Sequence, residues 1–445
     1  MSLFNTLNTG ATGLSTNTTN LSVIGDNIAN INTVGFKSGR ARFADMMPGD
    51  IPGIGQTYQV GTGARNGHVA TNFGQGSLEG TGSVLDMGIT GDGFFAVSSG
   101  ESTYYTRDGS FYMDTEGYIT SAGGLRLQGY QSSKEGDLTT LLGDLQIDQT
   151  PVTGESTTEI SVTANLSAEA EFVDDDGNPS TPLADLNIEG GGVTIEDAAL
   201  AADYATSITI YDSLGVAHEA TVLFERDADN NWNWSAVVDG GELDGAGPDD
   251  DGVAFQIAGG AATFDTDGNL VTSSQTDTAS AWNYEGAADL EIDFLFGADG
   301  SGTETDGGVT MTGNESSVTA ITQDGYGAGD LSNLTIDAEG VITGVYSNGE
   351  NVILGQVALA TFSSDVGMER IGGNLYHASQ DAGAPAMGTP DSGGRGTVNA
   401  YALEKSNVNL EDEFVHMIEA QRAYQSNARV ISTANETLQE LVNLV

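Results

Sequence analysis

Apolar side chains recur about every 3.5 residues near the C-terminus, a period typical of a helix that packs along one narrow stripe. No Gly or Pro interrupts residues 409–445, and Asn409 precedes three acidic residues, a typical helix start. The predicted helix of about 35 residues is about 50 Å long, so its stripe needs a partner. The stripe comprises Phe414, Met417, Gln421, Tyr424, Ala428, Ile431, Asn435, Leu438, Val442 and Val445.

A second stripe of the same period begins the chain: Leu3, Leu7, Gly10, Leu14, Asn17, Leu21, Ile24, Ile28 and Ile31. The residues between are Thr, Asn, Ser and Gly, which are mediocre helix formers, so we expect this helix to order on association. Two ordinary amphipathic helices on one globular domain are an alternative. Stripes at both ends of an otherwise β-patterned chain favour a coiled coil used for assembly. The predicted assembly residues are Leu7, Leu14, Leu21, Ile24, Ile28, Phe414, Met417, Tyr424, Ile431, Leu438 and Val442.

The middle of the chain has a β pattern. Short apolar runs alternate with Asp-Gly and Gly-Gly turns, the signal of successive hairpins. The pattern then loosens into strands separated by acidic, Gly-rich turns. Trp232 and Trp234 flank Asn233, which predicts a strand with one buried face. The tight hairpin pattern returns before the C-terminal helix.

This order predicts a mainly β fold with paired N- and C-terminal α-helices in a coiled coil, and a nested multi-domain β architecture. The outer layer is the helical assembly domain, an inner β domain lies within it, and an inserted β domain is innermost. The predicted parts are 1–32 with 405–445 (helical), 33–72 (extended connector with short strands), 73–149 with 323–404 (inner β domain) and 150–322 (insertion).

Composition narrows the function classes. The 445 residues carry a formal net charge of -51 with only 13 Lys and Arg, so nucleic acid and anionic membranes are poor partners. No window approaches 18 consecutive apolar residues, so we expect no membrane insertion. The absence of cysteine excludes a disulfide framework and a thiol nucleophile. No cleavable signal peptide is visible, which leaves a cytosolic protein or one exported by another route.

No catalytic pattern rises above chance. Residues 265–269 and 174–178 resemble calcium loops, but neither has the full spacing, and hairpin turns account better for both. The four histidines, His68, His218, His377 and His416, are far apart and form no HExxH motif. The nucleophile elbow and the Walker A loop are absent, and paired carboxylates are uninformative in so acidic a chain. We therefore predict no enzyme activity, no metal and no cofactor.

Two terminal motifs resemble the bacterial flagellar rod and hook proteins, a family of axial subunits. The first, VIGDNIANINTVGFK, occupies residues 23–37, and the second covers 404–410 and 417–428. Residues 91–95 and 127–130 are similar to the β core of the family. Residues 209–219, 323–331 and 344–356 are similar to its hook members, which carry an insertion that distal rod proteins lack. The signature residues are Asn27, Asn30, Gly35, Phe36, Lys37, Gln421, Arg422 and Tyr424.

The resemblance implies a structural subunit that stacks helically into a curved tube, with terminal helices inside and β domains outside. Such a tube is a universal joint that transmits motor torque while bending. The partners that it implies are further copies of the chain, the rod, the hook-capping and hook–filament junction proteins, and the flagellar type III export apparatus. The expected location is the extracellular hook. The strong acidity departs from a typical hook, and either a saline habitat or the solubility of the outer domains accounts for it.

Two other functions remain open. A distal rod or hook–filament junction protein of the same axial family would assemble into straight rather than curved tubes. A secreted acidic β-rich adhesin or carbohydrate-active protein would carry a carbohydrate or metal site in the insertion.

Overall fold

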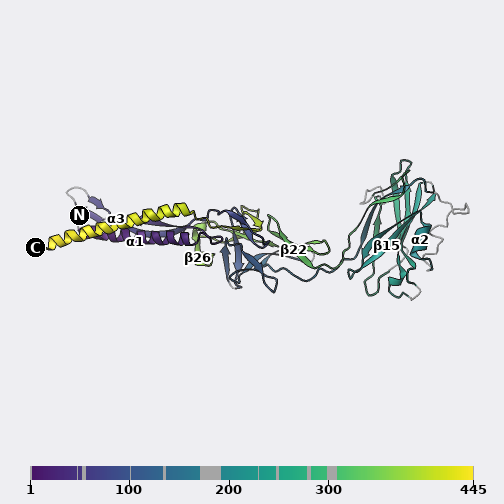
Figure 1. Ribbon diagram of the computed structural model, residues 1–445, viewed down its shortest axis with the longest axis horizontal. Coiled ribbons are helices and arrows are strands. Elements are labelled where there is room, and N and C mark those ends of the chain that lie inside the picture. The colour runs from purple at the N-terminus through teal and green to yellow at the C-terminus, as the bar shows by residue number, and fades with distance from the viewer. Residues whose placement is uncertain are drawn as a thin grey trace. The chain divides into compact units, whose positions relative to one another are not determined.

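A computed structural model describes residues 3–47, 49–52, 57–100, 102–133, 137–170, 192–228, 230–246, 250–277, 282–297 and 308–443. The chain divides into two compact units (Figure 1). The first unit comprises Met1–Gln149, Ser332–Val345 and Asn351–Val445, and the second comprises Thr150–Leu331 and Tyr346–Glu350. The predicted insertion 150–322 falls within the second unit, which also takes in residues 323–331 and 346–350. The division into a helical domain, a connector, an inner β domain and an insertion, with the bounds given above, stays a prediction.

The two terminal helices pack together in the first unit. Helix α1 spans Leu3–Ala29 and helix α3 spans Leu410–Asn443, and strands dominate the rest, so the predicted fold class is confirmed. Many polar side chains of α1 bond within the helix; Thr18 Oγ1, for example, donates to the Leu14 carbonyl at 2.9 Å. Such bonds satisfy hydroxyl groups without breaking the helix. Asn409 Oδ1 accepts from the Glu411 amide at 3.0 Å, which confirms the predicted start of α3.

Two hairpins follow α1. Strand β1 (Gly39–Asp45) pairs antiparallel with β4 (Ala64–Thr71), and β2 (Gly49–Pro52) pairs with β3 (Thr57–Val60). The β1–β4 ladder contacts α1, where Asn66 Nδ2 donates to Thr19 Oγ1 at 2.9 Å. The polar face of α1 therefore has a β ribbon as a neighbour as well as α3.

The β body of the first unit is one large sheet with two short accessory ladders. Among the described residues, thirteen strands form the sheet, with the central order β22-β23-β24-β11-β7-β8-β27-β26. Its apolar side includes Phe94, Tyr105 and Tyr376, whose rings pack edge to face or tilted against neighbouring rings. The sheet strands are β7 (Phe94–Ser98), β8 (Thr103–Thr106), β9 (Phe111–Met113), β10 (Ile119–Ser121), β11 (Arg126–Ser132), β12 (Leu138–Asp144), β22 (Leu331–Ile336), β23 (Val341–Tyr346), β24 (Asn351–Val357), β25 (Leu359–Thr361), β26 (Met368–Gly372), β27 (Leu375–Ala378) and β28 (Ala386–Gly388).

The accessory ladders close the first unit between distant parts of the chain. Strand β29 (Thr397–Ala400) pairs with β6 (Met87–Thr90), and β30 (Ala402–Glu404) pairs with β5 (Leu78–Gly80). The second ladder sets Glu404 beside the start of the β body, immediately before α3. A 3-10 turn, η4 (Asp365–Gly367), precedes β26.

The second unit packs a five-stranded antiparallel sheet, ordered β14-β15-β16-β17-β18, with a smaller sheet centred on β13. Trp232 and Trp234 on β16 are 0% and 1% exposed while Asn233 is half-buried, as predicted. The prediction of a single buried face is wrong beyond Trp234, because Val237 on the other face is also buried, against Ala198 of a short helix. The elements are β13 (Glu159–Ser167), α2 (Ile195–Ala201), β14 (Tyr204–Tyr211), β15 (Ala217–Ala228), β16 (Asn231–Asp239), η3 (Gly240–Glu242), β17 (Ala254–Phe264), β18 (Leu270–Asp277), β19 (Asp293–Leu295), β20 (Gly308–Thr312) and β21 (Ser317–Gln323).

The described calcium-like loop is a hairpin turn. Asp265 Oδ1 accepts from the amides of Asp267 and Asn269 at 2.9 and 2.8 Å, between β17 and β18. These bonds use the carboxylate as a turn cap, which confirms the hairpin interpretation of residues 265–269. The second loop, 174–178, lies outside the described residues.

Candidate assembly site

The helix pair is antiparallel and held close by small residues. A Cβ atom added at Gly10 would lie 2.8 Å from Ile431 Cγ1, and one added at Gly13 would lie 2.7 Å from Asn427 Nδ2. At the other end, Asn27 Nδ2 donates to Glu413 Oε1 at 3.1 Å. These contacts fix the register along the pair, and both chain ends lie at the same end of it (Figure 1).

The buried seam of α3 differs from the predicted stripe. Ala420 and Ala434 are 3% and 4% exposed, and both lie off the predicted stripe. Phe414 and Tyr424 are 48% and 40% exposed, so they lie outside the seam with α1. Gly10 and Gly13 of α1 make room for Ile431 and Asn427, and the small residues Ala420 and Ala434 complete the buried seam, so the seam is offset from the predicted stripe.

The other predicted assembly residues lie nearer the seam. Ile24 is fully buried, and the half-buried side chains are Leu7, Leu14, Leu21, Ile28, Met417, Ile431 and Leu438. The side chain of Val442 lies outside the described ones. The role of all these residues in assembly stays a prediction.

Asn27 joins α1 to two other elements. Its side chain donates to the Gly39 carbonyl at 2.8 Å and accepts from the Gly39 amide at 2.8 Å, in addition to its bond with Glu413. The residue itself is 1% exposed, while its partners Gly39 and Glu413 are half-buried. Asn27 therefore ties together α1, β1 and the first turn of α3.

The turn after α1 depends on Asn30, Gly35 and Phe36. Asn30 Nδ2 donates to the Asp26 carbonyl at 2.8 Å, and Gly35 has φ +67°. A Cβ at Gly35 would lie 2.5 Å from the Asp108 amide nitrogen, so both backbone conformation and space require glycine. Phe36 is 1% exposed beneath the guanidinium of Arg370, at 4.7 Å from the ring centroid.

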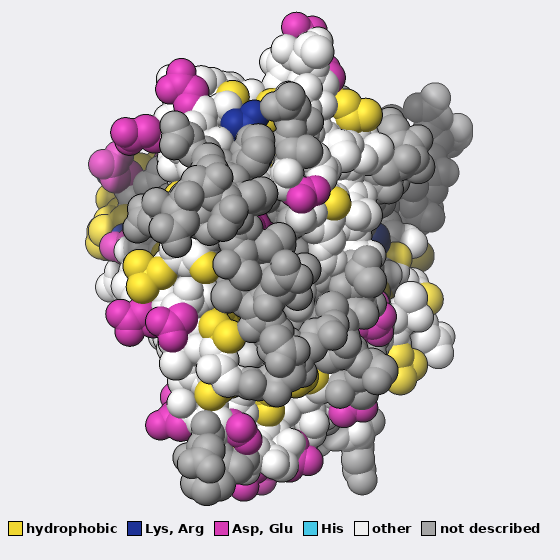
Figure 2. Space-filling view, turned by 90° about the vertical axis from the view of Figure 1, so that its right-hand side faces the viewer, with side chains coloured by type: hydrophobic (Ala, Val, Ile, Leu, Met, Phe, Trp, Pro, Cys, Tyr) yellow, Lys and Arg dark blue, Asp and Glu magenta, His cyan; other side chains and the backbone are white. Residues whose placement is uncertain are grey.

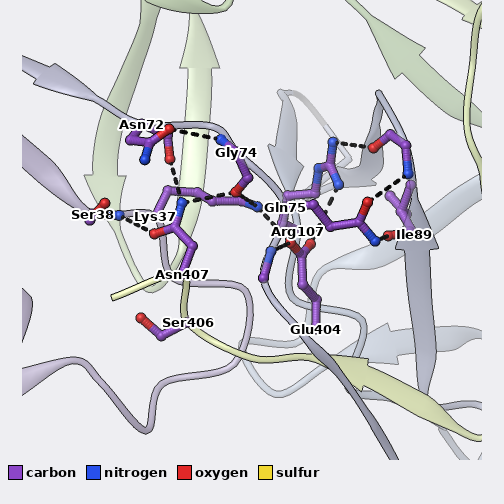
Figure 3. A network of polar contacts seen from close by, with 12 residues as sticks. Lys37, Ser38, Asn72, Gly74, Gln75, Ile89, Arg107, Glu404, Ser406 and Asn407 are labelled. Carbon is purple, nitrogen blue, oxygen red and sulfur yellow. Dashed lines mark hydrogen bonds and ion pairs between the residues drawn. The ribbon is translucent and has the colours of Figure 1, made fainter. Parts of the chain in front are cut away.

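Lys37 lies in a buried ionic junction (Figure 3). Its Nζ donates to Glu404 Oε1 at 2.6 Å and to the Gly74 carbonyl at 2.9 Å. Arg107 reaches the other oxygen of Glu404 at 3.4 Å and the Gly91 carbonyl at 2.9 Å. The side chains of Lys37 and Glu404 are both 0% exposed. The junction thus links residues 367 positions apart through charge-assisted bonds.

Burial lowers the pKa of Lys37, and the charge of Glu404 offsets only part of that shift. Burial likewise lowers the pKa of Arg107, again opposed by Glu404. One carboxylate therefore pairs with two buried cations, while Asp92 and Asp365 add smaller opposing effects at Arg107. Removing the Glu404 carboxylate would leave both cations in a low-dielectric site.

Asn407 extends the junction toward α3 (Figure 3). Its Oδ1 accepts from the Ser38 amide at 2.8 Å, and its Nδ2 donates to the carbonyls of Asn72 and Gly74, each at 2.8 Å. The segment entering α3 is therefore held to both sides of the connector. Bonds of this kind fix the position at which α3 leaves the β body.

The C-terminal signature residues are placed differently from the N-terminal ones. Gln421, Arg422 and Tyr424 all lie exposed on α3, while Asn27, Gly35, Phe36 and Lys37 are buried. The N-terminal signature is accounted for within one subunit. Exposed signature residues on α3 have their side chains available to another molecule.

Sequence reasoning missed Glu404, Arg107 and Asn407 as site residues. A lysine directly after the buried Gly35-Phe36 pair requires a buried acid, which is a usable signal. The sequence offers 64 Asp and Glu residues as candidates, however, and the correct one is 367 positions away. Only the pairing of β30 with β5 identifies it.

The described residues contain no group of three or more His, Cys, Asp or Glu side chains arranged to hold a metal ion. In the same part of the chain, no helix has both the length and the apolar character needed to cross a bilayer.

Family models match most of the chain. "Flagella basal body rod protein" matches residues 7–37 and "Flagellar basal body rod FlgEFG protein C-terminal" matches 400–444. Between them, "Flagellar hook protein FlgE/F/G D1 domain" matches 88–213 and "Flagellar basal body protein FlaE D2 domain" matches 180–326. The terminal models cover most of the helix pair together with Lys37 and Glu404 of the ionic junction.

Curated relatives match along nearly the full length. The flagellar hook protein FlgE of Escherichia coli is 34% identical, with 97% of this chain and 98% of the relative covered. That of Borreliella burgdorferi is 30% identical, with 99% and 100% covered. A solved hook protein structure from Helicobacter pylori covers 74% of this chain at 15% identity, with a TM-score of 0.48. On the full-length sequence matches, the chain belongs to the flagellar hook protein family.

Proposed function

We propose that the chain is a structural subunit that assembles helically into the flagellar hook, a flexible tube that transmits motor torque to the filament. The observation that carries the proposal is the uncovered surface of α3. Apolar side chains that α1 leaves at least 39% exposed are Leu410, Phe414, Val415, Ile418, Tyr424 and Val430. A helix with apolar side chains outside its intramolecular seam is suited to packing against neighbouring subunits.

The ionic junction suits a load-bearing role. Torque that passes between the helix pair and the β body has to cross the short segments 30–38 and 404–409. The buried Lys37–Glu404 bond and the partly buried bonds of Asn27 and Asn407 hold these segments together. A stiff junction between helices and β body would let the first unit move as a piece while the tube bends.

The second unit has a surface suited to sliding. Figure 2 shows Asp and Glu side chains scattered mainly around the rim of one of its faces, among hydrophobic and uncharged groups, with few Lys or Arg. Like charges on facing surfaces disfavour permanent adhesion. Such surfaces suit a tube in which the distance between neighbouring outer domains changes during each rotation.

We propose further copies of the chain as the main partner, and the rod, hook-capping and hook–filament junction proteins as axial neighbours. Family models of the rod type at both termini support the rod contact. Export by the flagellar type III apparatus to an extracellular hook belongs to the same proposal. The proposal assigns the chain no catalytic activity and no cofactor.

Electron microscopy of polymer formed by the purified chain tests this function. Curved tubes are expected, whereas straight rods would favour a distal rod or junction protein. Leu438→Asp should abolish tubes, since it forfeits about 1.5 to 3 kcal/mol of apolar burial and adds a buried carboxylate in every subunit. Glu440→Gln, at an exposed position on the same turn, is the matched control and should assemble normally.

A further inference from the structure

The side of α3 that faces away from α1 carries an apolar and basic stripe. We name Phe414, Ile418, Arg422, Gln425 and Arg429 the outer row; their spacing of four, four, three and four residues places them on one helix face. Phe414 and Ile418 are 48% and 49% exposed, and the other three are also exposed. In a chain with 13 basic residues and a net charge of -51, two arginines on one helix face are a local excess of positive charge.

A groove of about 440 Å³ lies on another side of the helix pair, bounded by α1, β1, the segment before α3 and the first turns of α3. We name it the side groove. Its apolar lining includes Val23, Phe43 and Val408, and its carboxylates are Asp412, Glu413 and Glu419. His416 also lines the groove, and Arg40 is the one arginine in the lining, so the three carboxylates outnumber the arginine.

The outer row and the side groove are complementary in chemistry. The row offers two large apolar side chains followed by two arginines, and the groove offers apolar side chains followed by carboxylates along α3. Since they belong to different faces of α3, one helix cannot bring its own row into its own groove. The occupant that fits is therefore the α3 of a second copy of this chain.

We propose that the outer row of one subunit seats in the side groove of the next, an inference that rests on the proposed function and names its subunit contact. Because the two surfaces differ, the contact is heterologous and leaves a free row and a free groove on every pair. Heterologous contacts that do not close produce open helical polymers. A symmetric row-to-row contact would instead bring arginines against arginines.

Charge reversal in the full-length chain tests the contact. The row variant Arg422→Glu/Arg429→Glu sets acid against an acidic groove, and the groove variant Asp412→Lys/Glu419→Lys sets base against a basic row. Each variant alone should lose at least tenfold in sedimentable polymer, with the circular dichroism spectrum of the monomer unchanged. The control Arg42→Glu/Arg65→Glu reverses two exposed arginines on the β1–β4 ribbon and should assemble like the parent.

Mixing the row variant with the groove variant is the decisive test of the row-in-groove contact. An equimolar mixture of row and groove variants should restore polymer, because each reversed surface then meets an opposite charge and each unreversed surface meets its original partner. A mixture that stays unassembled, or a row variant that polymerises alone, would overturn the row-in-groove contact while the proposed function stands. Failure of the parent chain to polymerise would instead count against the proposed function.

Discussion

Both units have an apolar core, but the first unit also buries an ionic junction. In the second unit, Trp232 and Trp234 fill the space between two sheets, with Trp234 packed against Phe296 at 4.9 Å between ring centroids. In the first unit, Lys37, Arg107 and Glu404 place charges at 0% to 4% exposure beneath the helix pair. Apolar packing depends on volume and has no single indispensable partner. An ionic junction is directional and fails when one member is removed.

Apolar packing and the ionic junction have different structural roles. A core filled by volume gives the second unit a stability of its own, whatever its neighbours do. The junction instead specifies one relation between segments 367 residues apart. We therefore expect the first unit to be the more sensitive to loss of a single charge, and the second to loss of a single ring.

Trp234→Ala should have the largest effect, a loss of about 3 to 5 kcal/mol in the free energy of unfolding of the second unit. All three tryptophans of the chain, at 232, 234 and 282, belong to this unit, so tryptophan fluorescence reports its unfolding alone. Helical circular dichroism, dominated by α1 and α3, should show the first unit unchanged. Coincident loss of both signals would break the distinction between the units.

Glu404→Gln should destabilise the first unit by about 3 kcal/mol, because Lys37 and Arg107 stay buried without the carboxylate that pairs with both. Chemical denaturation followed by helical circular dichroism measures the loss. Glu79→Gln is the matched control, since Glu79 pairs with Lys405 at 2.8 Å with both side chains more than half exposed. That exposed pair should contribute less than about 1 kcal/mol, and an equal effect of the two changes would refute the importance of the junction.

Alkaline pH should produce a smaller effect centred on Tyr376. Burial raises the pKa of Tyr376 to about 12, from an ordinary value of 10.0. Between these values the unfolded chain releases a proton that the folded chain retains, so stability falls as pH rises above 10. The loss at pH 11 is about 1.4 kcal/mol for the first unit.

Comparing the parent with Tyr376→Phe from pH 9 to pH 11 checks this, since Phe cannot titrate. The variant should show a shallower decline in the stability of the first unit. An identical decline in both proteins would assign the alkaline sensitivity to other groups.

The sequence predicted secondary-structure elements better than it predicted contacts between distant residues. The C-terminal helix, its Asn409 cap and the alternation at Trp232 and Trp234 follow from local periodicity and capping, which neighbouring residues determine. The buried seam of α3 was harder to predict, because it depends on the register of a distant helix, whose Gly10 and Gly13 lie against Ile431 and Asn427. The partner of Lys37 was hidden for the same reason, since it depends on how distant strands pair.

The order of events during folding follows from the Lys37–Glu404 pair. Closing a flexible loop of 367 residues is entropically unfavourable, but prior folding of the second unit roughly halves the free loop by bridging Val152 to Gly329, a gain of only about 0.6 kcal/mol. Loop-closure entropy therefore hardly constrains the order of folding, whereas the order in which the residues are synthesised constrains it strictly. In a chain synthesised from its N-terminus, α1 and Lys37 emerge long before Glu404 and α3 exist. The first unit therefore stays open until the last tenth of the chain arrives, which delays the moment at which the subunit can engage another.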